Sequence, residues 1–402
     1  MKAVAFFEHG PVDVLQYKED FPDPVAGKDD EVIIDITYCG INHLDIWTRQ
    51  GIGAVAGQKI RLPHICGCDI VGTTAFDGQR VMIYPGVFCG KCEYCTNSNN
   101  KASPTRSIGG GGGGGKTNGH DSSNKWRENL CNQFAIIGGL SNYNGGYAER
   151  VAVPEKNIVR LPSALKDETA ATLAVSYLTA WNMLQTSGAG RKKKILVYGA
   201  SSGVGMATIQ LAGALDATVI TTVSDNQKYD FAKKIGAHHI IDRRTQDIKD
   251  EVKKIVPGGV DIVIDHVGAA TWPTSIASLR QGGTMAVCGM TSGNEGTIPI
   301  RTFYTKQIIM VGSLLGTRAQ LQELINFIMR KKIYPIIDSV FPLQDAKEAQ
   351  KKMELGKHAG KICSSYRDDL PFSSSSVSSA ISIAVCESTF GSSVRSSVLS
   401  AM

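Results

Sequence analysis

The sequence predicts an α/β protein with two domains, and three observations support this prediction. The chain has 402 residues, which is longer than a single hydrophobic core usually organises. Up to about residue 155, short runs of β-branched residues alternate with Gly, Pro and Asp turns, as expected of a β-rich domain. Further along the chain, buried strand patterns alternate with helix patterns. This alternation is typical of a doubly wound parallel sheet.

The elements follow in that order. In the β-rich part we expect strands at EVIIDITYCG (31–40), DIVGTTAF (69–76), RVMIYPG (80–86) and YAERVAVP (147–154). Residues 167–184 keep their apolar side chains on one helical face, so we expect one helix there. The alternating part has expected strands at 194–199, 218–223, 238–242, 260–267 and 283–289, with helices at 205–215, 226–236, 246–256 and 274–280. An amphipathic helix (318–332), a strand (338–343) and a last helix (344–356) complete the pattern.

Composition excludes several classes of protein. The formal charge of +6 is small and spread along the chain, which indicates a solvated surface and no nucleic-acid partner. No apolar run approaches the roughly 18–20 residues that span a bilayer, so no membrane partner is expected. The apolar stretch at the N-terminus is too short for a secretory signal, and we therefore expect a cytoplasmic protein.

Two segments break the pattern. Residues 97–125 form a low-complexity stretch with seven consecutive glycines, and residues 364–402 are rich in serine without useful periodicity. Both compositions are typical of flexible or disordered chain, so we assign no function to either segment.

A glycine-rich turn indicates a dinucleotide site. The sequence ILVYGASSGVG (195–205) follows an expected strand and opens an expected helix. Glycine lets the backbone approach a pyrophosphate, and the helix N-terminus offers unpaired N–H groups to phosphate. The expected cofactor-binding residues of this Rossmann turn are Gly199, Ala200, Ser201, Ser202, Gly203, Val204 and Gly205.

The next strand bears on which nicotinamide nucleotide binds. An NAD site usually places a carboxylate about 20 residues after the glycines. That count from Gly203 reaches Val223 and Ser224, although Asp225 lies close by. Lys228 and Arg243 follow, and cations beside a hydroxyl suit a 2′-phosphate. The sequence favours NADP(H), with NAD(H) as the alternative.

A cysteine cluster indicates a metal site. Cys89, Cys92 and Cys95 have the two-residue spacing that lets thiolates converge on one tetrahedral Zn²⁺, and Cys131 is the fourth candidate. Four thiolates leave no open coordination position. One structural Zn²⁺ is therefore expected, without a chemical role.

These motifs together resemble the medium-chain dehydrogenase/reductase family, which includes zinc alcohol dehydrogenases and zeta-crystallin-like quinone oxidoreductases. The ordered matches are CGINHLDIWTRQG, LPHICGCDIVG, RVMIYPGVFCGKCEYC, GGYAERVAVP, AATLAVSYLTAW, GASSGVG, VDIVIDHVG and HAGKIC. The resemblance implies a GroES-like catalytic domain (1–160 and 305–363), a Rossmann domain (161–304) and an active site in the cleft between them. It also implies a homodimer or homotetramer.

The resemblance places the catalytic positions residue by residue. The three ligands of the family's catalytic zinc fall on Asn42, Cys68 and Val175, and the proton-relay Ser/Thr falls on Leu44. Asn and Val do not replace thiolates, so zinc-assisted alcohol oxidation is poorly supported.

Asn42 and Thr179 instead look like the quinone-reductase branch, where the matching residues line the nicotinamide and substrate pocket. Asp45, the third catalytic candidate, is expected to orient the backbone of the cleft. We therefore expect hydride transfer from NADPH to a small quinone or enone carbonyl compound.

Two alternatives stay open. The first is an alcohol dehydrogenase with an unusual second zinc bound among Cys39, His43, His64, Cys66, Cys68 and Asp69. The second is a nucleotide-binding sensor or scaffold protein without turnover.

Overall fold

The computed structural model describes residues 1–27, 30–52, 60–96 and 127–366. Residues 1–366 form one compact unit. The segment 97–125, expected to be flexible, lies outside the described residues, as does the chain from residue 367 onward.

A seven-stranded sheet organises the β-rich part. Its order is β10-β6-β5-β3-β18-β17, and β9 pairs with β3 as well. The strands are β3 (Glu31–Gly40), β5 (Asp69–Thr74), β6 (Arg80–Ile83), β9 (Arg150–Pro154), β10 (Ile158–Arg160), β17 (Ile337–Pro342) and β18 (Lys361–Ser365). The antiparallel pairing of β18 with β3 places the last strand of the described residues beside a strand from the N-terminal part. This pairing sets Lys361 close to the loop that follows β3.

Smaller elements surround this sheet. They are β1 (Ala3–Phe6), β2 (Gln16–Lys18), β4 (His64–Ile65), β7 (Gly86–Val87), β8 (Ala135–Ile136), α1 (His43–Gln50), α2 (Glu93–Thr96) and α11 (Ala346–Glu354). The buried Arg49 side chain on α1 donates to Gln350 and forms an ion pair with Glu354, both on α11. These contacts of Arg49 connect helix α1 to helix α11.

The second sheet has six parallel strands in the order β13-β12-β11-β14-β15-β16. This is the 3-2-1-4-5-6 order of the Rossmann fold, and it confirms the predicted doubly wound sheet. The strands are β11 (Lys194–Val197), β12 (Thr218–Val223), β13 (His239–Asp242), β14 (Val260–Asp265), β15 (Leu279–Val287) and β16 (Ile309–Gly312). In the central strands β11, β12 and β14, the high Val, Ile and Leu content suits strands buried on both faces.

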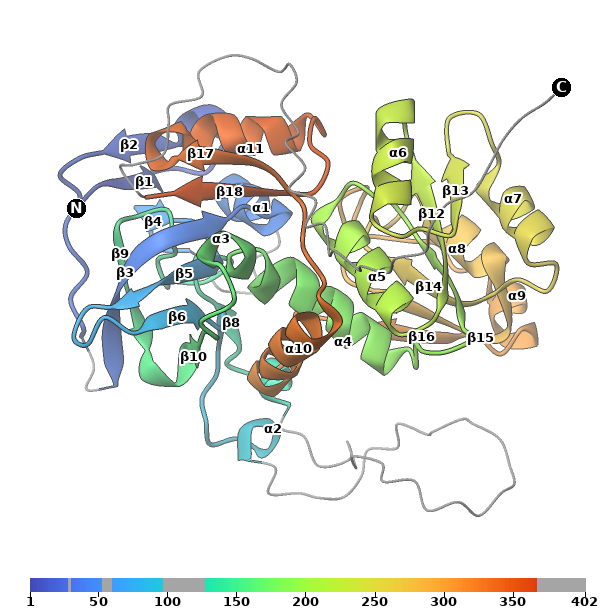
Figure 1. Cartoon of the computed structure of the whole chain (residues 1–402), viewed down its shortest axis with the longest axis horizontal. Coiled ribbons are helices and arrows are strands. Elements are labelled where there is room, and N and C mark those ends of the chain that lie inside the picture. The colour runs from blue at the N-terminus through green and yellow to red at the C-terminus, as the bar shows by residue number, and fades with distance from the viewer. Residues whose placement is uncertain (28–29, 53–59, 97–126, 367–402) are drawn as a thin grey trace, which may run out of the picture. The chain divides into compact units, whose positions relative to one another are not determined.

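Figure 1 shows the helices that lie next to this sheet. They are α5 (Gly203–Ala214), α6 (Asn226–Lys234), α7 (Ile248–Ile255), α8 (Trp272–Ser278) and α9 (Ile300–Thr305). Helix α10 (Arg318–Lys331) begins with a capping box at Thr317 and Gln320 and packs on α4 (Leu178–Thr186). The bounds of α5, α6, α7, α8 and α10 agree with the predicted helices to within about two residues, whereas α9 was not predicted.

One expected helix is divided. The single helix predicted over 167–184 consists of α3 (Asp167–Ala170), a π-helical turn (Leu173–Tyr177) and α4 (Leu178–Thr186). The prediction was wrong because apolar periodicity cannot detect a change in backbone hydrogen bonding. Within the π turn, the N–H of Val175 donates to the Asp69 carboxylate at 2.7 Å. Such turns often occur at functional sites.

Two predicted boundaries also differ from the structure. Ser364 and Ser365 were expected in a disordered tail, but they lie in β18 opposite Cys39 and Tyr38 of β3. Backbone pairing and burial keep this end of the chain in the sheet. The six-stranded sheet continues to Gly312, beyond the predicted domain boundary at residue 304. The division into two domains otherwise stays a prediction.

No helix in the described part of the chain is both long and apolar enough to cross a membrane.

Candidate functional site

Asn42 lies between β3 and α1, and it is the N-cap residue of α1. Its backbone N–H donates to the carboxylate of Asp45 at 2.7 Å, and the Asp45 N–H donates to the Asn42 carbonyl at 3.0 Å. This reciprocal arrangement satisfies two backbone donors at the helix start. It fixes the backbone from which the Asn42 side chain extends, so the amide can be held in one orientation.

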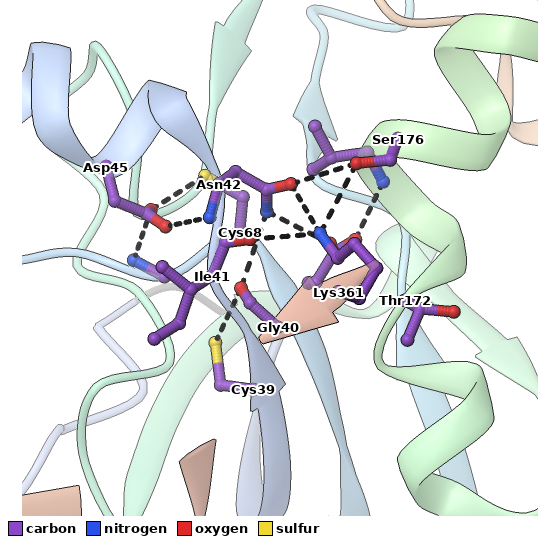
Figure 2. A network of polar contacts seen from close by, with 12 residues as sticks. Cys39, Gly40, Ile41, Asn42, Asp45, Cys68, Thr172, Ser176 and Lys361 are labelled. Atoms are coloured by element: carbon purple, nitrogen blue, oxygen red, sulfur yellow. Dashed lines mark hydrogen bonds and ion pairs between the residues drawn. The ribbon is translucent and has the colours of Figure 1, made fainter. Parts of the chain in front are cut away.

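The side chain of Asn42 belongs to a buried polar cluster (Figure 2). Its Oδ1 accepts from Lys361 Nζ at 2.7 Å and from Ser176 Oγ at 3.3 Å. Its Nδ2 donates to Asp69 Oδ2 at 2.9 Å. We call Asn42, Asp69, Ser176 and Lys361 the Asn42 network.

Lys361 is the cation of this network. Its ammonium lies 3.0 Å from Asp69 Oδ2, and both side chains are buried, with 1% and 0% exposure. It also donates to the Ile41 carbonyl at 3.0 Å and to Ser176 Oγ at 3.3 Å. A buried ion pair is tolerated only when further hydrogen bonds satisfy both groups, as they do here.

The sequence analysis did not select Lys361 or Ser176 as site residues. Lys361 was visible only as part of the HAGKIC motif, and Asp69 only as a possible metal ligand. Lys361 and Asp69 are separated by 292 positions in the chain, so no local pattern could pair them.

Thr179 lies outside the Asn42 network. It is buried on α4, and no hydrogen bond of its hydroxyl is recorded among the described residues. Ser176, in the π turn one helical turn earlier, takes part in the network instead. The expectation that Thr179 lines the nicotinamide pocket stays a prediction.

Asp45 is completely buried and its carboxylate is occupied by the protein. It accepts from the Gly67 N–H at 3.1 Å and from the Tyr147 hydroxyl at 3.1 Å, as well as from Asn42. Burial raises the pKa of Asp45 to about 7, although the hydrogen bonds from Asn42 and Tyr147 oppose the shift. These contacts suit a residue that orients backbone.

The glycine turn has the geometry of a phosphate site. Gly199 has φ +61°, and a Cβ at Gly205 would stand 2.2 Å from the Gly199 carbonyl oxygen. Ser202 caps α5 by accepting from the Gly205 N–H at 3.0 Å. The close approach of backbone to backbone requires glycine here. The remaining N–H groups at the start of α5 could bind phosphate.

The same turn touches the Asn42 network. A Cβ at Gly203 would lie 2.6 Å from Ser176 Oγ and 3.2 Å from Lys361 Cδ. The Ser201 carbonyl accepts from the Gly360 N–H at 2.9 Å, and the Ala200 N–H donates to Thr222 of β12 at 3.1 Å. Val204 begins α5 beside Gly203. The expected phosphate turn and the Asn42 network are therefore neighbours.

The residues expected at the 2′-phosphate gather where β12 ends. Lys228 Nζ lies 3.4 Å from Ser224 Oγ and 3.6 Å from Asp225 Oδ2. Arg243 has an exposed side chain, and its N–H donates to the Val223 carbonyl at 3.1 Å. Asp225 caps α6 and accepts from the Lys228 N–H. Its carboxylate is thus occupied by protein donors.

The four predicted cysteines converge. One ligand atom from each of Cys89, Cys92, Cys95 and Cys131 lies within 4.8 Å of every other. Cys95 Sγ is 3.4 Å from Cys92 Sγ and 3.9 Å from Cys89 Sγ. Tetrahedral zinc with Zn–S bonds of about 2.3 Å needs sulfurs about 3.8 Å apart. The donor set and spacing fit one zinc ion.

Backbone donors also prepare this cluster for thiolates. The N–H groups of Lys91 and Cys92 donate to Cys89 Sγ at 3.5 and 3.3 Å, and they lower the pKa of Cys89 to about 6. The N–H of Gln133 donates to Cys131 Sγ at 3.4 Å. Such donors stabilise the ionised form that binds metal.

A second zinc site is not assembled. In the described ranges, the four-cysteine cluster is the one group that brings three or more potential ligand atoms together. Cys66 Sγ and Cys68 Sγ contact the Asp45 carbonyl and carboxylate, and burial raises the pKa of both thiols. His64 lies against Phe6. These cysteines and His64 are core residues in this structure.

Comparisons with known proteins agree with this architecture. Residues 28–163 match the model of the alcohol dehydrogenase GroES-like domain, and residues 203–330 match that of the zinc-binding dehydrogenases. An alcohol dehydrogenase of Geobacillus stearothermophilus is 27% identical over 343 residues, which are 83% of this chain and 91% of that protein. The quinone oxidoreductase of Homo sapiens is 25% identical over 90% of this chain and 97% of its own.

A solved structure of an NAD-dependent alcohol dehydrogenase is 31% identical, with a TM-score of 0.78, and covers 91% of this chain and 100% of its own. The GroES-like and Rossmann parts predicted from the motifs are thereby confirmed as the fold. The chain is an oxidoreductase that belongs to the medium-chain dehydrogenase/reductase family.

Proposed function

We propose that this enzyme transfers a hydride from NADPH to an electron-poor carbonyl compound, either a quinone or an α,β-unsaturated carbonyl. The Asn42 network supports this proposal most directly. At the positions where the resemblance places catalytic zinc ligands, Asn42 and Val175 instead bond to Asp69. The ammonium of Lys361 supplies the positive charge within this cluster. Direct hydride transfer needs orientation of two bound molecules rather than a Lewis acid.

The chain's own residues would act by positioning. The turn from Gly199 to Gly205 would hold the pyrophosphate, with Ser202 keeping the start of α5 in shape. Ser224, Lys228 and Arg243 would contact the 2′-phosphate that distinguishes NADPH from NADH. Asn42, whose amide is fixed by three neighbours, would border the nicotinamide.

The reduced product also needs a proton. The ammonium of Lys361 is held by four oxygen atoms, and the carboxyl of Asp45 is held by backbone and Tyr147 donors. Neither group is placed to exchange a proton with a substrate. We therefore propose that solvent water supplies the proton after the hydride has moved.

The four-cysteine cluster would bind one Zn²⁺ with a structural role. Four thiolates fill a tetrahedral shell, so no position is left for substrate or water. The resemblance further favours a homodimer or homotetramer, which size-exclusion chromatography with light scattering would determine.

The test is an acceptor panel. Oxidation of NADPH and NADH is followed at 340 nm with quinones and enones, and NAD⁺ and NADP⁺ reduction is followed with alcohols. We expect turnover with NADPH and the electron-poor acceptors. Asn42→Ala should lower kcat/KM roughly tenfold or more, because the amide that holds Lys361, Ser176 and Asp69 together beside the expected nicotinamide is lost. Asn142→Ala, at an exposed asparagine, is the matched control.

One observation favours a second candidate. The identity of 31% with a solved NAD-dependent alcohol dehydrogenase leaves alcohol oxidation as the alternative. Efficient NAD⁺ reduction by alcohols, without turnover of quinones or enones, would replace our proposal with this one. Tight NADPH binding without any turnover in the panel would instead indicate a sensor or scaffold role.

A further inference from the structure

A short segment between α11 and β18, residues 356–360, passes beside the expected cofactor site. We call it the crossing segment. At its start, the Gly356 carbonyl accepts from Lys228 Nζ at 3.1 Å. At its end, the Gly360 N–H donates to the Ser201 carbonyl at 2.9 Å. It therefore contacts both the 2′-phosphate end and the pyrophosphate turn of the expected dinucleotide site.

The crossing segment has a fixed backbone. Gly356 and Gly360 have φ +63° and +112°, and a Cβ at Gly360 would stand 2.4 Å from the Ile336 carbonyl oxygen. The Ala359 N–H donates to Asp338 Oδ1 at 2.9 Å. The segment is thus held between two glycines and a carboxylate, which leaves His358 in a defined position.

His358 is the unexplained side chain of this segment. It is 8% exposed, and its Nδ1 is buried without a hydrogen-bond partner. Buried polar atoms are almost always satisfied, and an unsatisfied one costs free energy. An imidazole nitrogen can be satisfied by accepting a hydrogen bond or, when protonated, by donating one to an anion. The second arrangement suits a phosphate.

The charges around His358 are mainly positive. Burial lowers the pKa of His358, as do Lys228 on α6, Lys361 on β18 and Lys352 on α11, whereas Asp338 on β17 raises it. Lys352 forms an ion pair with Asp338 at 2.5 Å, which offsets that carboxylate.

His43 on α1 faces the same region. Burial and the charges of His358, His266 and Lys361 lower the pKa of His43 to about 4. Lys228, Lys361 and Lys352 are paired with Asp225, Asp69 and Asp338, so a further anion bound here would be the partner that a protonated imidazole lacks.

From this geometry we propose that His358 contacts a phosphate oxygen of the bound dinucleotide, and that its imidazole takes up a proton when the dinucleotide binds. This inference rests on the proposed function, since it requires a nicotinamide dinucleotide in the Rossmann turn. It adds a phosphate contact from outside the glycine motif. It also makes cofactor binding depend on pH.

The direction of that dependence follows from linkage. In the free protein burial, helped by Lys228, Lys361 and Lys352 against the opposing charge of Asp338, holds the pKa of His358 below its usual value, so the imidazole is neutral near pH 7. A bound phosphate stabilises the imidazolium and raises this pKa. Binding is therefore tighter at acidic pH and weakens as pH rises from the pKa of the free protein to that of the complex, by at most about tenfold per pH unit.

The experiment measures the Kd of NADH and NADPH by fluorescence between pH 5.5 and 8.5, for the whole chain and three variants. NADH is included because the 2′-phosphate of NADPH itself titrates near pH 6 and would change Kd in the same pH range. NADH lacks that phosphate, so its Kd reports on the protein groups. His358→Ala removes the contact, and His358→Asn keeps a neutral hydrogen-bonding group without a charge. His239→Gln is the control, since His239 is exposed and begins β13, at the opposite end of the strand from Asp242. Thermal melting confirms folding.

We expect the Kd of His358→Ala to rise roughly tenfold at pH 6 and less at pH 8. His358→Asn should show a flatter dependence of Kd on pH than the parent chain, while His239→Gln follows the parent. Loss of affinity for both nucleotides would place His358 at the diphosphate, and loss for NADPH alone would place it at the 2′-phosphate. Both results support the inference.

Two other outcomes would contradict the inference. If both His358 variants bind NADH and NADPH as the parent does at every pH, the inference is overturned and the proposed function is untouched. If the parent chain binds neither nucleotide, the proposed function itself has failed, and the inference fails with it.

Discussion

The four-cysteine cluster and the Asn42 network are both polar centres inside the same compact unit, but they are built in opposite ways. In the cluster, four sulfur atoms of one chemical kind face one another, and like groups of this kind converge stably around a cation. In the network, a carboxylate, an amide, a hydroxyl and an ammonium already satisfy one another. The four-cysteine cluster is expected to bind a metal ion, whereas in the Asn42 network the Lys361 side chain is itself the cation.

The Asn42 network also bears on where this chain departs from the alcohol dehydrogenases that it resembles. The resemblance places the catalytic metal of alcohol dehydrogenases where this chain has Asn42 and Val175. Here the ammonium of Lys361 stands among oxygen atoms of Asn42 and Asp69. A fixed ammonium can hold an amide in place, but it has no open coordination position to activate an alcohol. The comparison leads to three tests, in order of the expected effect.

The largest effect should come from the cysteine cluster. We expect one zinc per chain by elemental analysis, and none in Cys95→Ser, because a buried thiolate ligand is removed. The free energy of unfolding should fall by more than about 5 kcal/mol, since loss of a metal site is among the few causes of such values. Urea denaturation measures the loss.

Cys288→Ser is the matched control, because Cys288 lies outside the cluster and is only partly exposed. It should retain both the zinc and most of the stability. Two zinc ions per parent chain would contradict the contrast drawn between the two centres and would favour alcohol dehydrogenation.

A smaller effect is expected from the cation of the Asn42 network. Lys361→Met leaves the Asp69 carboxylate buried without its partner, and breaking such a pair typically costs about 3–5 kcal/mol. Adding Asp69→Asn should recover much of that loss, because the amide carries no charge and its single oxygen can still accept the hydrogen bond from the Val175 N–H. Urea denaturation of the parent, the single variant and the double variant measures this recovery.

Lys351→Met is a suitable control, since Lys351 belongs to an exposed ion pair on α11. Pairs of that kind contribute about 0–1 kcal/mol. A Lys361→Met protein as stable as the parent would show that the ammonium is not the internal cation that the comparison requires.

The third effect concerns Asp45, next to the network, and it is spread over about three pH units. Its pKa is raised from 3.8 to about 7 in the folded protein, so between these pH values the folded state holds a proton that the unfolded chain has released. Stability should therefore fall as pH rises from about 4 to 7, by at most about 1.4 kcal/mol per pH unit, and should level off above pH 7. Asp45→Asn should lose this component.

The measurement is urea denaturation of the parent and Asp45→Asn at several pH values between 4.5 and 8. Only the difference between the two proteins matters, because other groups titrate in the same range. Identical pH dependence in both would mean that Asp45 is ionised throughout, and that the folded protein does not hold the extra proton.

Much of the fold could be predicted because its signals are local. The strand, glycine turn and helix around Gly199–Gly205 follow one another in the sequence, and three of the four cluster cysteines lie between residues 89 and 95. In such segments, spacing along the chain fixes spacing in the structure. The prediction then needs only standard helix and strand geometry.

The Asn42 network could not be predicted in the same way. Lys361 reaches Asp69 because β18 pairs with β3, a contact between opposite ends of the described chain. Ser176 reaches Asn42 from a π turn, which periodicity read as ordinary helix. The resemblance pointed to Thr179 instead, three residues further along. Long-range pairing and a local change in helix type are both invisible to short patterns.

The close contacts of Gly203 limit how the coenzyme preference of this enzyme can be redesigned. Any side chain there would press on Ser176 Oγ within 2.6 Å, so the pyrophosphate turn cannot be altered without disturbing the Asn42 network. Libraries aimed at switching coenzyme preference should leave the glycine turn untouched and vary Ser224, Lys228 and Arg243. Arg243 is exposed and Ser224 and Lys228 are partly exposed, and changes there leave the residues that border the expected nicotinamide as they are.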